Sequence, residues 1–177
     1  MKGAILEKGE RYFTNMSRVF NAINNVQKDY NWLITDGEGH PADKSFDGYR
    51  HGDYIWITGE QLTDIVNNDK CRQWVWAVLS GFPKNILKEK VLQYSLPYAD
   101  GYKGFWENPI TIQHPLAEIE IAPWDSGLVL IISKHDKIVN CFTASMPLAE
   151  DLEIYNDMHK QNEWEGALKY IDEQHND

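Results

Sequence analysis

Acidic and histidine side chains gather in one stretch of the chain, residues 36–53 (DGEGHPADKSFDGYRHGD), where chemistry would be sought first. Carboxylates and imidazoles at this density could supply oxygen and nitrogen ligands to a metal ion. The residues of these types are Asp36, Glu38, His40, Asp43, Asp47, His51 and Asp53. Their spacing matches neither a calcium-binding loop nor an H-E-x-x-H helix. Because Asp and Gly also suit turns, the pattern favours a polar loop, and we expect no metal and no cofactor.

A general base with an orienting acid could also be drawn from the same loop, as His51 and Asp53. No G-x-S-x-G segment accompanies this pair, and neither Cys71 nor Cys141 lies in a nucleophile signature. A small metal-dependent or histidine-dependent hydrolase that uses the 36–53 loop therefore stays an alternative. The sequence favours a protein that is not an enzyme.

The charge of the chain is strongly negative, at −10, with 27 acidic against 17 basic residues. A negative protein repels a phosphate backbone, so nucleic acid is not an expected partner. Residues 150–177 hold nine acids against Lys160 and Lys169, a net charge of −7. An acidic surface of this kind can steer a basic partner.

The hydrophobic pattern predicts short strands and amphipathic helices along the whole chain. Strands are expected at residues 3–8, 30–35, 54–58, 74–80, 117–124, 127–133 and 137–143, the last three as an antiparallel meander. A helix is expected over residues 10–27, a second one after a capping box of Thr58 and Gln61, and a third opening at Ser145 and running into the tail. The fold class predicted is α+β, a mostly antiparallel sheet with N-terminal and C-terminal helices packed on it, in one globular domain of residues 1–177.

Side-chain alternation predicts which strand faces are buried. Trp74 and Trp76 share one face of the 74–80 strand, and the opposite face is also apolar, so we expect both faces of that strand to be covered. A core strand is favoured over an exposed stacking platform. Glu118 and Glu120 alternate with isoleucines, which predicts one solvated and one buried face for the 117–124 strand.

Residues 97–108 form an aromatic loop, whose Tyr98, Tyr102, Phe105 and Trp106 could either anchor an interface or fold back onto the core. With the acidic loop and the acidic tail, this loop predicts a surface for a cationic protein. The candidate partner-binding residues are Asp36, Glu38, Asp43, Asp47, Asp53, Trp106, Glu107, Asp151, Glu153, Asp157, Glu163 and Glu165.

Three segments carry a family resemblance: DYNWLI, WVWAVLSGFPK and WDSGLVLIISKHDKI. They resemble a small uncharacterised bacterial family, the DUF 2691-like proteins, for which no reaction is implied. The acidic, tryptophan-rich chain is also similar in style to bacterial toxin immunity proteins. That likeness implies a protein that binds and occludes a basic toxin such as a nuclease; a regulatory binding domain without a toxin partner is a further alternative.

The N-terminus has no apolar segment of the signal-peptide type, and the longest apolar run, GLVLII, is too short to span a bilayer. A cytoplasmic location and no membrane partner are therefore expected.

Overall fold

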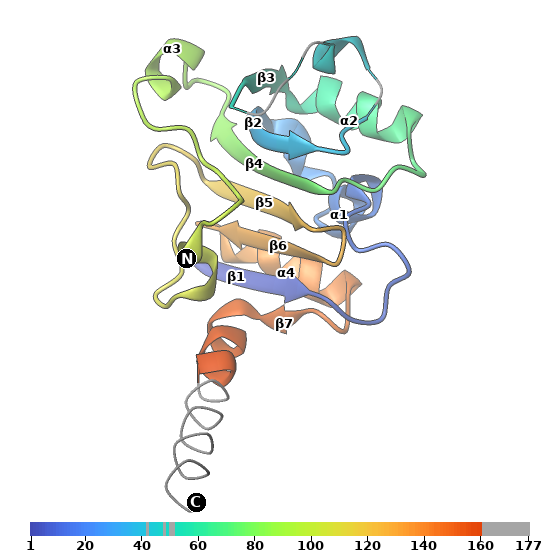
Figure 1. Ribbon diagram of the computed structural model, residues 1–177, viewed down its shortest axis with the longest axis vertical. Helices are drawn as coiled ribbons and strands as arrows, with labels where there is room; N and C mark the ends of the chain where they lie inside the picture. The colour runs from blue at the N-terminus through green and yellow to red at the C-terminus, as the bar shows by residue number, and fades with distance from the viewer. Residues whose placement is uncertain (42, 48, 50–51, 161–177) are drawn as a thin grey trace, which may run out of the picture.

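The computed structural model describes residues 1–41, 43–47, 49 and 52–160, and an antiparallel sheet dominates it (Figure 1). In the described residues this sheet has seven strands in the order β3-β2-β4-β5-β6-β1-β7. The strands are β1 (Lys2–Leu6), β2 (Tyr30–Glu38), β3 (Tyr54–Thr58), β4 (Trp76–Pro83), β5 (Ile119–Trp124), β6 (Leu128–Ser133) and β7 (Glu150–Asp151). Every pairing is antiparallel. The α+β prediction is confirmed.

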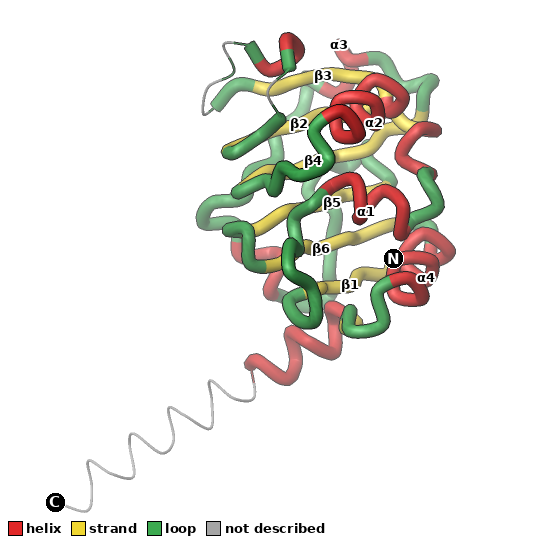
Figure 2. The backbone as a smooth tube through the Cα atoms, turned by 90° about the vertical axis from the view of Figure 1, so that its right-hand side faces the viewer, coloured by secondary structure: helices red, strands yellow, loops and turns green. Residues whose placement is uncertain are grey.

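Three helices cover one face of the sheet, as Figure 2 shows from the side. They are α1 (Met16–Ala22), α2 (Gly59–Asn68) and α4 (Asp136–Ser145), and the short helix η1 (Val26–Asp29) leads into β2. The core on this face contains Phe20, Trp32 and Phe142, all with almost no exposed surface. A last helix begins at residue 152 and is described as far as residue 160.

The opposite face of the sheet is covered by residues 84–117, which we call the crossing segment (Figure 1). It contains the helical turns α3 (Lys88–Val91) and η3 (Lys103–Trp106) and long irregular stretches. Its Phe105, Ile110 and Ile112 pack with sheet residues such as Phe82 and Leu130 in a second buried cluster. The sheet is therefore buried on both faces, and the apolar character of both faces of β4 is explained.

Among the described residues, no helix combines the length and the apolar character that a crossing of the bilayer requires.

The predicted strand at residues 137–143 is wrong, because this segment lies within α4. Ile138, Val139 and Phe142 are buried at helical spacing, and a short apolar run of this kind does not distinguish a strand from a buried helix. The helix expected from Ser145 is also misplaced, since β7 intervenes before the helix at residue 152. The helix predicted over 10–27 is reduced to α1 and η1.

The two tryptophans at the start of β4 do not share a face, which corrects the predicted alternation. Trp74 packs in the cluster beneath the helices, whereas Trp76 packs on the crossing-segment side. The register between β2 and β4 shifts between Thr35 and Glu38. This irregularity, together with the fact that β4 begins only at Trp76, breaks the period of two that the sequence suggested.

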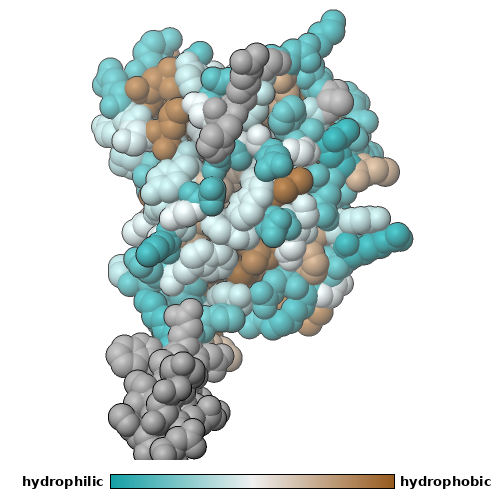
Figure 3. All heavy atoms as spheres, in the orientation of Figure 1, coloured by the Kyte–Doolittle hydropathy of each residue, from teal (hydrophilic) through white to brown (hydrophobic). Residues whose placement is uncertain are grey.

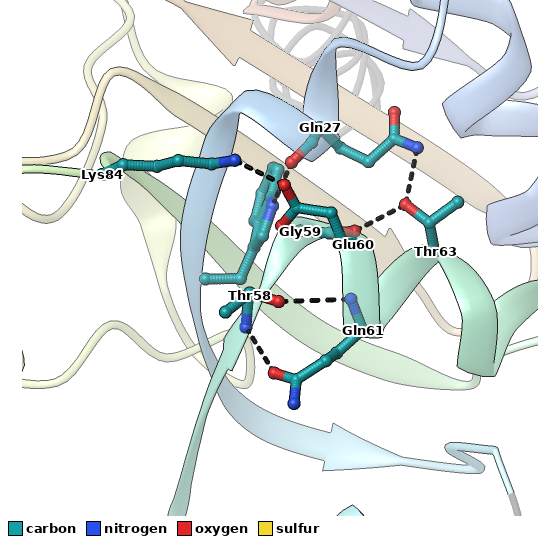
Figure 4. Close-up of polar contacts among 8 residues, drawn as sticks. Gln27, Thr58, Gly59, Glu60, Gln61, Thr63 and Lys84 are labelled. Atoms are coloured by element: carbon teal, nitrogen blue, oxygen red, sulfur yellow. Dashed lines mark hydrogen bonds and ion pairs between the residues drawn. The ribbon is translucent and has the colours of Figure 1, made fainter.

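The start of α2 matches its sequence signal, as the close-up in Figure 4 shows. The Thr58 hydroxyl accepts from the Gln61 N–H, and the Gln61 side chain accepts from the Thr58 N–H, both at 3.2 Å. Gly59 lies against the backbone of η1, and a Cβ atom there would overlap the Gln27 carbonyl oxygen. That carbonyl also accepts from the indole N–H of Trp32 at 2.8 Å, so it has little freedom to move.

We expect Gly59→Ala to destabilise the fold by about 2–4 kcal/mol, because the added methyl group displaces backbone and not a flexible side chain. Urea denaturation measures the change. Gly127→Ala is the matched control: its Cβ would have only an ordinary contact at 3.6 Å, so a change within about 0.5 kcal/mol is expected. Equal losses in the two variants would contradict the close packing of α2 on η1.

Candidate functional site

The crossing segment is held to the sheet by a carboxylate at the end of β2. The Oδ2 atom of Asp36 accepts the N–H groups of Ala99 (2.8 Å) and Asp100 (3.0 Å). Within the crossing segment, the Gln113 amide bonds the backbone of Tyr98 twice, through its oxygen and through its nitrogen, each at 3.0 Å. These bonds fix where residues 98–100 lie over the sheet.

A second carboxyl group, that of Glu120, lies in the middle of the sheet beneath the crossing segment. Its side chain is buried, with 1% of the residue exposed, and its Oε2 atom accepts the Gln113 N–H at 3.2 Å. Burial raises the pKa of Glu120 to about 8, and the bonds from Gln113 and the nearby Ser80 hydroxyl oppose this rise only in part. Glu120 is thus mostly protonated at neutral pH.

Glu120 also leaves buried polar atoms unsatisfied. Ser80 lies opposite Glu120 in the β4–β5 register. The Ser80 hydroxyl is close enough to affect the pKa of the Glu120 carboxyl. The two groups are not oriented for a hydrogen bond from the hydroxyl to the carboxyl. Among the described residues, neither Ser80 Oγ nor Glu120 Oε1 has a partner. Unsatisfied buried groups cost free energy, and the O–H of the protonated Glu120 carboxyl is the donor that can satisfy the Ser80 hydroxyl oxygen.

The predicted solvated position of Glu120 is therefore wrong, and Glu118 alone fits the expected pattern. Glu118 is partly exposed and meets His135 Nε2 at 2.9 Å. The alternation of Glu and Ile predicts a strand with one solvated face, but the crossing segment covers that face. Nothing local to residues 117–124 carries that information.

An acidic cavity opens where β2 ends and β4 begins. It has a volume of about 470 Å³ and is lined by Asp36, Gly37, Glu38, Trp76 and Asp100. Glu38 and Asp100 are exposed, and Trp76 is half-buried. Glu38 pairs with Trp76 across the strands, and the Asp36 bonds bring Asp100 to the same place. Three carboxylates thus surround one tryptophan.

A row of half-buried aromatic rings leads away from this cavity. Trp76 meets Trp124 with ring centroids 4.6 Å apart, Trp124 meets Trp106 at 5.3 Å, and Trp106 lies 6.5 Å from Tyr155. Trp106 and Tyr155 line a second cavity of about 480 Å³, together with Glu107, Lys103, His159 and Lys160. We call the whole surface the acidic–aromatic face, made of Asp36, Glu38, Trp76, Asp100, Trp106, Glu107, Trp124 and Tyr155.

Four of the predicted partner-binding residues, Asp36, Glu38, Trp106 and Glu107, belong to the acidic–aromatic face. Sequence reasoning missed Asp100 and placed Trp76 in the core. Trp106 is a half-buried wall of a cavity, not a projecting anchor. In the aromatic loop Phe105 is buried in the core, whereas Tyr98 is 50% exposed; the use of this loop at an interface stays a prediction.

Other predicted acids hold local backbone or side chains in place. Asp43 accepts the Ser45 N–H at 2.8 Å, and Asp151 accepts the N–H groups of Glu153 and Ile154 at the start of the last helix. Asp157 accepts the Asn108 side-chain amide at 2.8 Å. Asp47, Asp53 and Glu153 are exposed, whereas Glu163 and Glu165 lie outside the described residues.

The described histidines make packing contacts or ion pairs. His40 stacks on Phe46 with ring centroids 4.8 Å apart. Burial lowers the pKa of His114, which bonds the Val91 carbonyl at 3.1 Å, and His135 meets Glu118. His51 lies outside the described residues. In the part of the chain that the structure describes, no three His, Cys, Asp or Glu side chains come together as metal ligands.

The buried carboxyl group predicts a particular pH dependence of stability. Because the folded-state pKa of Glu120, about 8, exceeds its ordinary value of 4.5, its contribution is complete below pH 4.5 and is lost as the pH rises through 8. Glu120→Gln should remove this loss. We expect the difference in unfolding free energy between variant and parent to grow in favour of the variant by up to about 1.4 kcal/mol per pH unit between pH 5 and 8.

Urea denaturation at several pH values measures this difference. Glu89→Gln, at an exposed position of α3, is the control and should follow the parent at every pH. If the unfolding free energies of the parent and of Glu120→Gln change with pH in parallel, the prediction is contradicted, because Glu120 would then be ionised in the folded protein.

Comparison with protein-family models, with curated proteins and with solved structures gives no match. No family is therefore assigned to the chain, and its own geometry must support any functional proposal.

Proposed function

We propose that this chain is a binding protein that holds a basic protein against the acidic–aromatic face. The observation that carries the proposal is the convergence of Asp36, Glu38 and Asp100 around the half-buried Trp76. We further propose that the partner is a bacterial toxin, in the first instance a nuclease, that the chain occludes in the manner of a cytoplasmic immunity protein. The resemblance in sequence style supports that finer assignment.

The distribution of charge over the sheet supports a directed encounter. Lys2, Lys84 and Lys134 adjoin one end of the sheet, because β1 begins there and β4 and β6 end there. The acidic cavity lies at the opposite end. Because Lys84 is paired with Glu60, the attraction comes mainly from the carboxylates at the acidic cavity, which orient a basic partner during diffusion and raise the association rate at low salt.

The aromatic row supplies contacts that charge alone does not. Tryptophan and tyrosine side chains contribute much of the binding energy at protein interfaces when they are rigid and partly desolvated. The edge-to-face contacts of Trp124 with Trp76 and Trp106 hold these rings in place. An arginine or lysine of the partner can meet a tryptophan face and a carboxylate in the same cavity.

Figure 3 shows that the face formed by the crossing segment is largely hydrophilic, with hydrophobic atoms in small separate patches. Such a surface suits a partner that is held by polar contacts and a few aromatic rings, and it does not suit an obligate apolar interface.

Co-expression with the product of the neighbouring upstream gene tests the proposal. If that product is a toxin, the parent chain should restore growth, and Glu38→Lys with Asp100→Lys should abolish the rescue, since both side chains are exposed and their reversal turns attraction into repulsion. With purified proteins, the association rate should fall at least about tenfold at low salt.

Glu89→Lys with Glu60→Lys is the matched control, with the same change in net charge at exposed positions outside the acidic–aromatic face. It should keep the rescue. Loss of rescue in both double variants alike would mean that net charge alone matters. Binding to a neighbouring gene product that is not toxic would favour a regulatory binding domain. If the chain binds no neighbouring gene product, toxic or not, the proposal is contradicted.

A further inference from the structure

The strand β3 leaves one edge of the sheet open. It pairs with β2 from Asn31↔Thr58 to Thr35↔Tyr54, and among the described residues no strand pairs with its outer side. In an antiparallel pair, alternate residues turn their N–H and C=O groups away from the neighbouring strand. The outer side of β3 therefore presents a row of backbone donors and acceptors.

This edge lacks the features that commonly protect edge strands. The sequence of β3, YIWIT, contains no charged residue and no proline, although such residues usually discourage pairing at an exposed edge. The opposite edge of the sheet is different, because β7 is only two residues long and both residues are acidic. The contrast marks the β3 edge as suited to pairing.

A groove runs along β3. Its volume is about 460 Å³, and four consecutive strand residues, Tyr54 to Ile57, line it together with Ser45, Gln61 and Lys88. Lys88 Nζ lies 5.1 Å from the centroid of the Tyr54 ring. The strand is thus recessed between the segment that carries Ser45 and the side chains of Gln61 and Lys88.

The end of the groove at Tyr54 is acidic. An adjoining cavity of about 220 Å³ is lined by Ser45, Asp47, Tyr49, Asp53, Tyr54 and Ile55. Asp47 and Asp53 are exposed, and none of the described residues that line this cavity is a lysine or an arginine. A basic side chain at this end of a bound strand would be favoured by charge.

We propose that the β3 edge binds an extended segment of a protein partner as an additional strand, with a basic side chain placed at the Tyr54 end. Backbone pairing supplies the affinity, and Asp47 sets the direction. A single extended segment fits a recessed edge.

The inference deepens the proposed function in one respect, the basic character of the partner, but it concerns a separate surface. The probe is a fluorescein-labelled, acetylated and amidated peptide, Thr-Val-Thr-Val-Thr-Lys-Lys. In antiparallel pairing its carboxyl-terminal lysines reach the Tyr54 end. We expect saturable binding, at least tenfold weaker when alternate amides of the peptide are N-methylated and at least tenfold weaker when the two lysines are replaced by glutamates.

Asp47→Lys tests the site on the chain, at an exposed position that leaves the core intact. This substitution should weaken binding of the lysine peptide and strengthen binding of the glutamate peptide. Glu89→Lys, with the same change of charge on α3, should change neither affinity by more than about twofold. Binding that ignores N-methylation, an equal effect of the two variants, or no binding at about 1 mM peptide would overturn the inference.

A concentration-dependent dimer in sedimentation that an excess of the lysine peptide dissociates would also overturn it, by showing that a second copy occupies the edge. The Glu38→Lys, Asp100→Lys chain should bind the peptide as the parent does. Lost toxin rescue with intact peptide binding would then contradict only the proposed function of the acidic–aromatic face.

Discussion

The attachment of the crossing segment to the sheet is the constraint on which the rest of this structure depends. A sheet that is apolar on both faces needs two covers, and here helices provide only one of them. The other cover, residues 84–117, has little regular structure of its own, so its backbone groups must find partners elsewhere. Asp36 and Glu120 supply acceptors from the sheet, and Gln113 ties the segment to itself.

This requirement divides the acidic residues into two groups with different roles. Asp36, Asp43, Asp151 and Asp157 accept hydrogen bonds that hold loops and a helix start in place. Glu38, Asp100, Glu107, Asp47, Asp53 and Glu153 are exposed. The negative charge of the chain is therefore not all directed at a partner, and recognition depends mainly on the second group. The first group positions the second, most clearly where Asp36 brings Asp100 beside Glu38 and Trp76.

Local sequence signals predicted the elements better than the surfaces. The strands of residues 30–35, 54–58 and 127–133 and the capping box at Thr58 are confirmed, because alternation and capping are properties of neighbouring residues. The strand predicted at residues 137–143 is wrong, because a run of seven residues rich in apolar side chains is compatible with either a strand or a buried helix. Burial of Glu120 depends on the crossing segment, from which Gln113 donates to it, and the acidic cavity at Trp76 depends on Asp36, Glu38 and Asp100. No pattern within either strand encodes these contacts.

Amide hydrogen exchange at Gln113, Ala99 and Asp100, followed by NMR at about pH 6.5, tests the attachment of the crossing segment most directly. The three N–H groups donate to Glu120 and Asp36. They should exchange at least about 100-fold more slowly than in an unstructured peptide, although residues 98–100 belong to no helix or strand. Exchange of all three as fast as that of the exposed Gly101 would contradict the account, because residues 98–100 and 113 would then not be attached to the sheet by these hydrogen bonds.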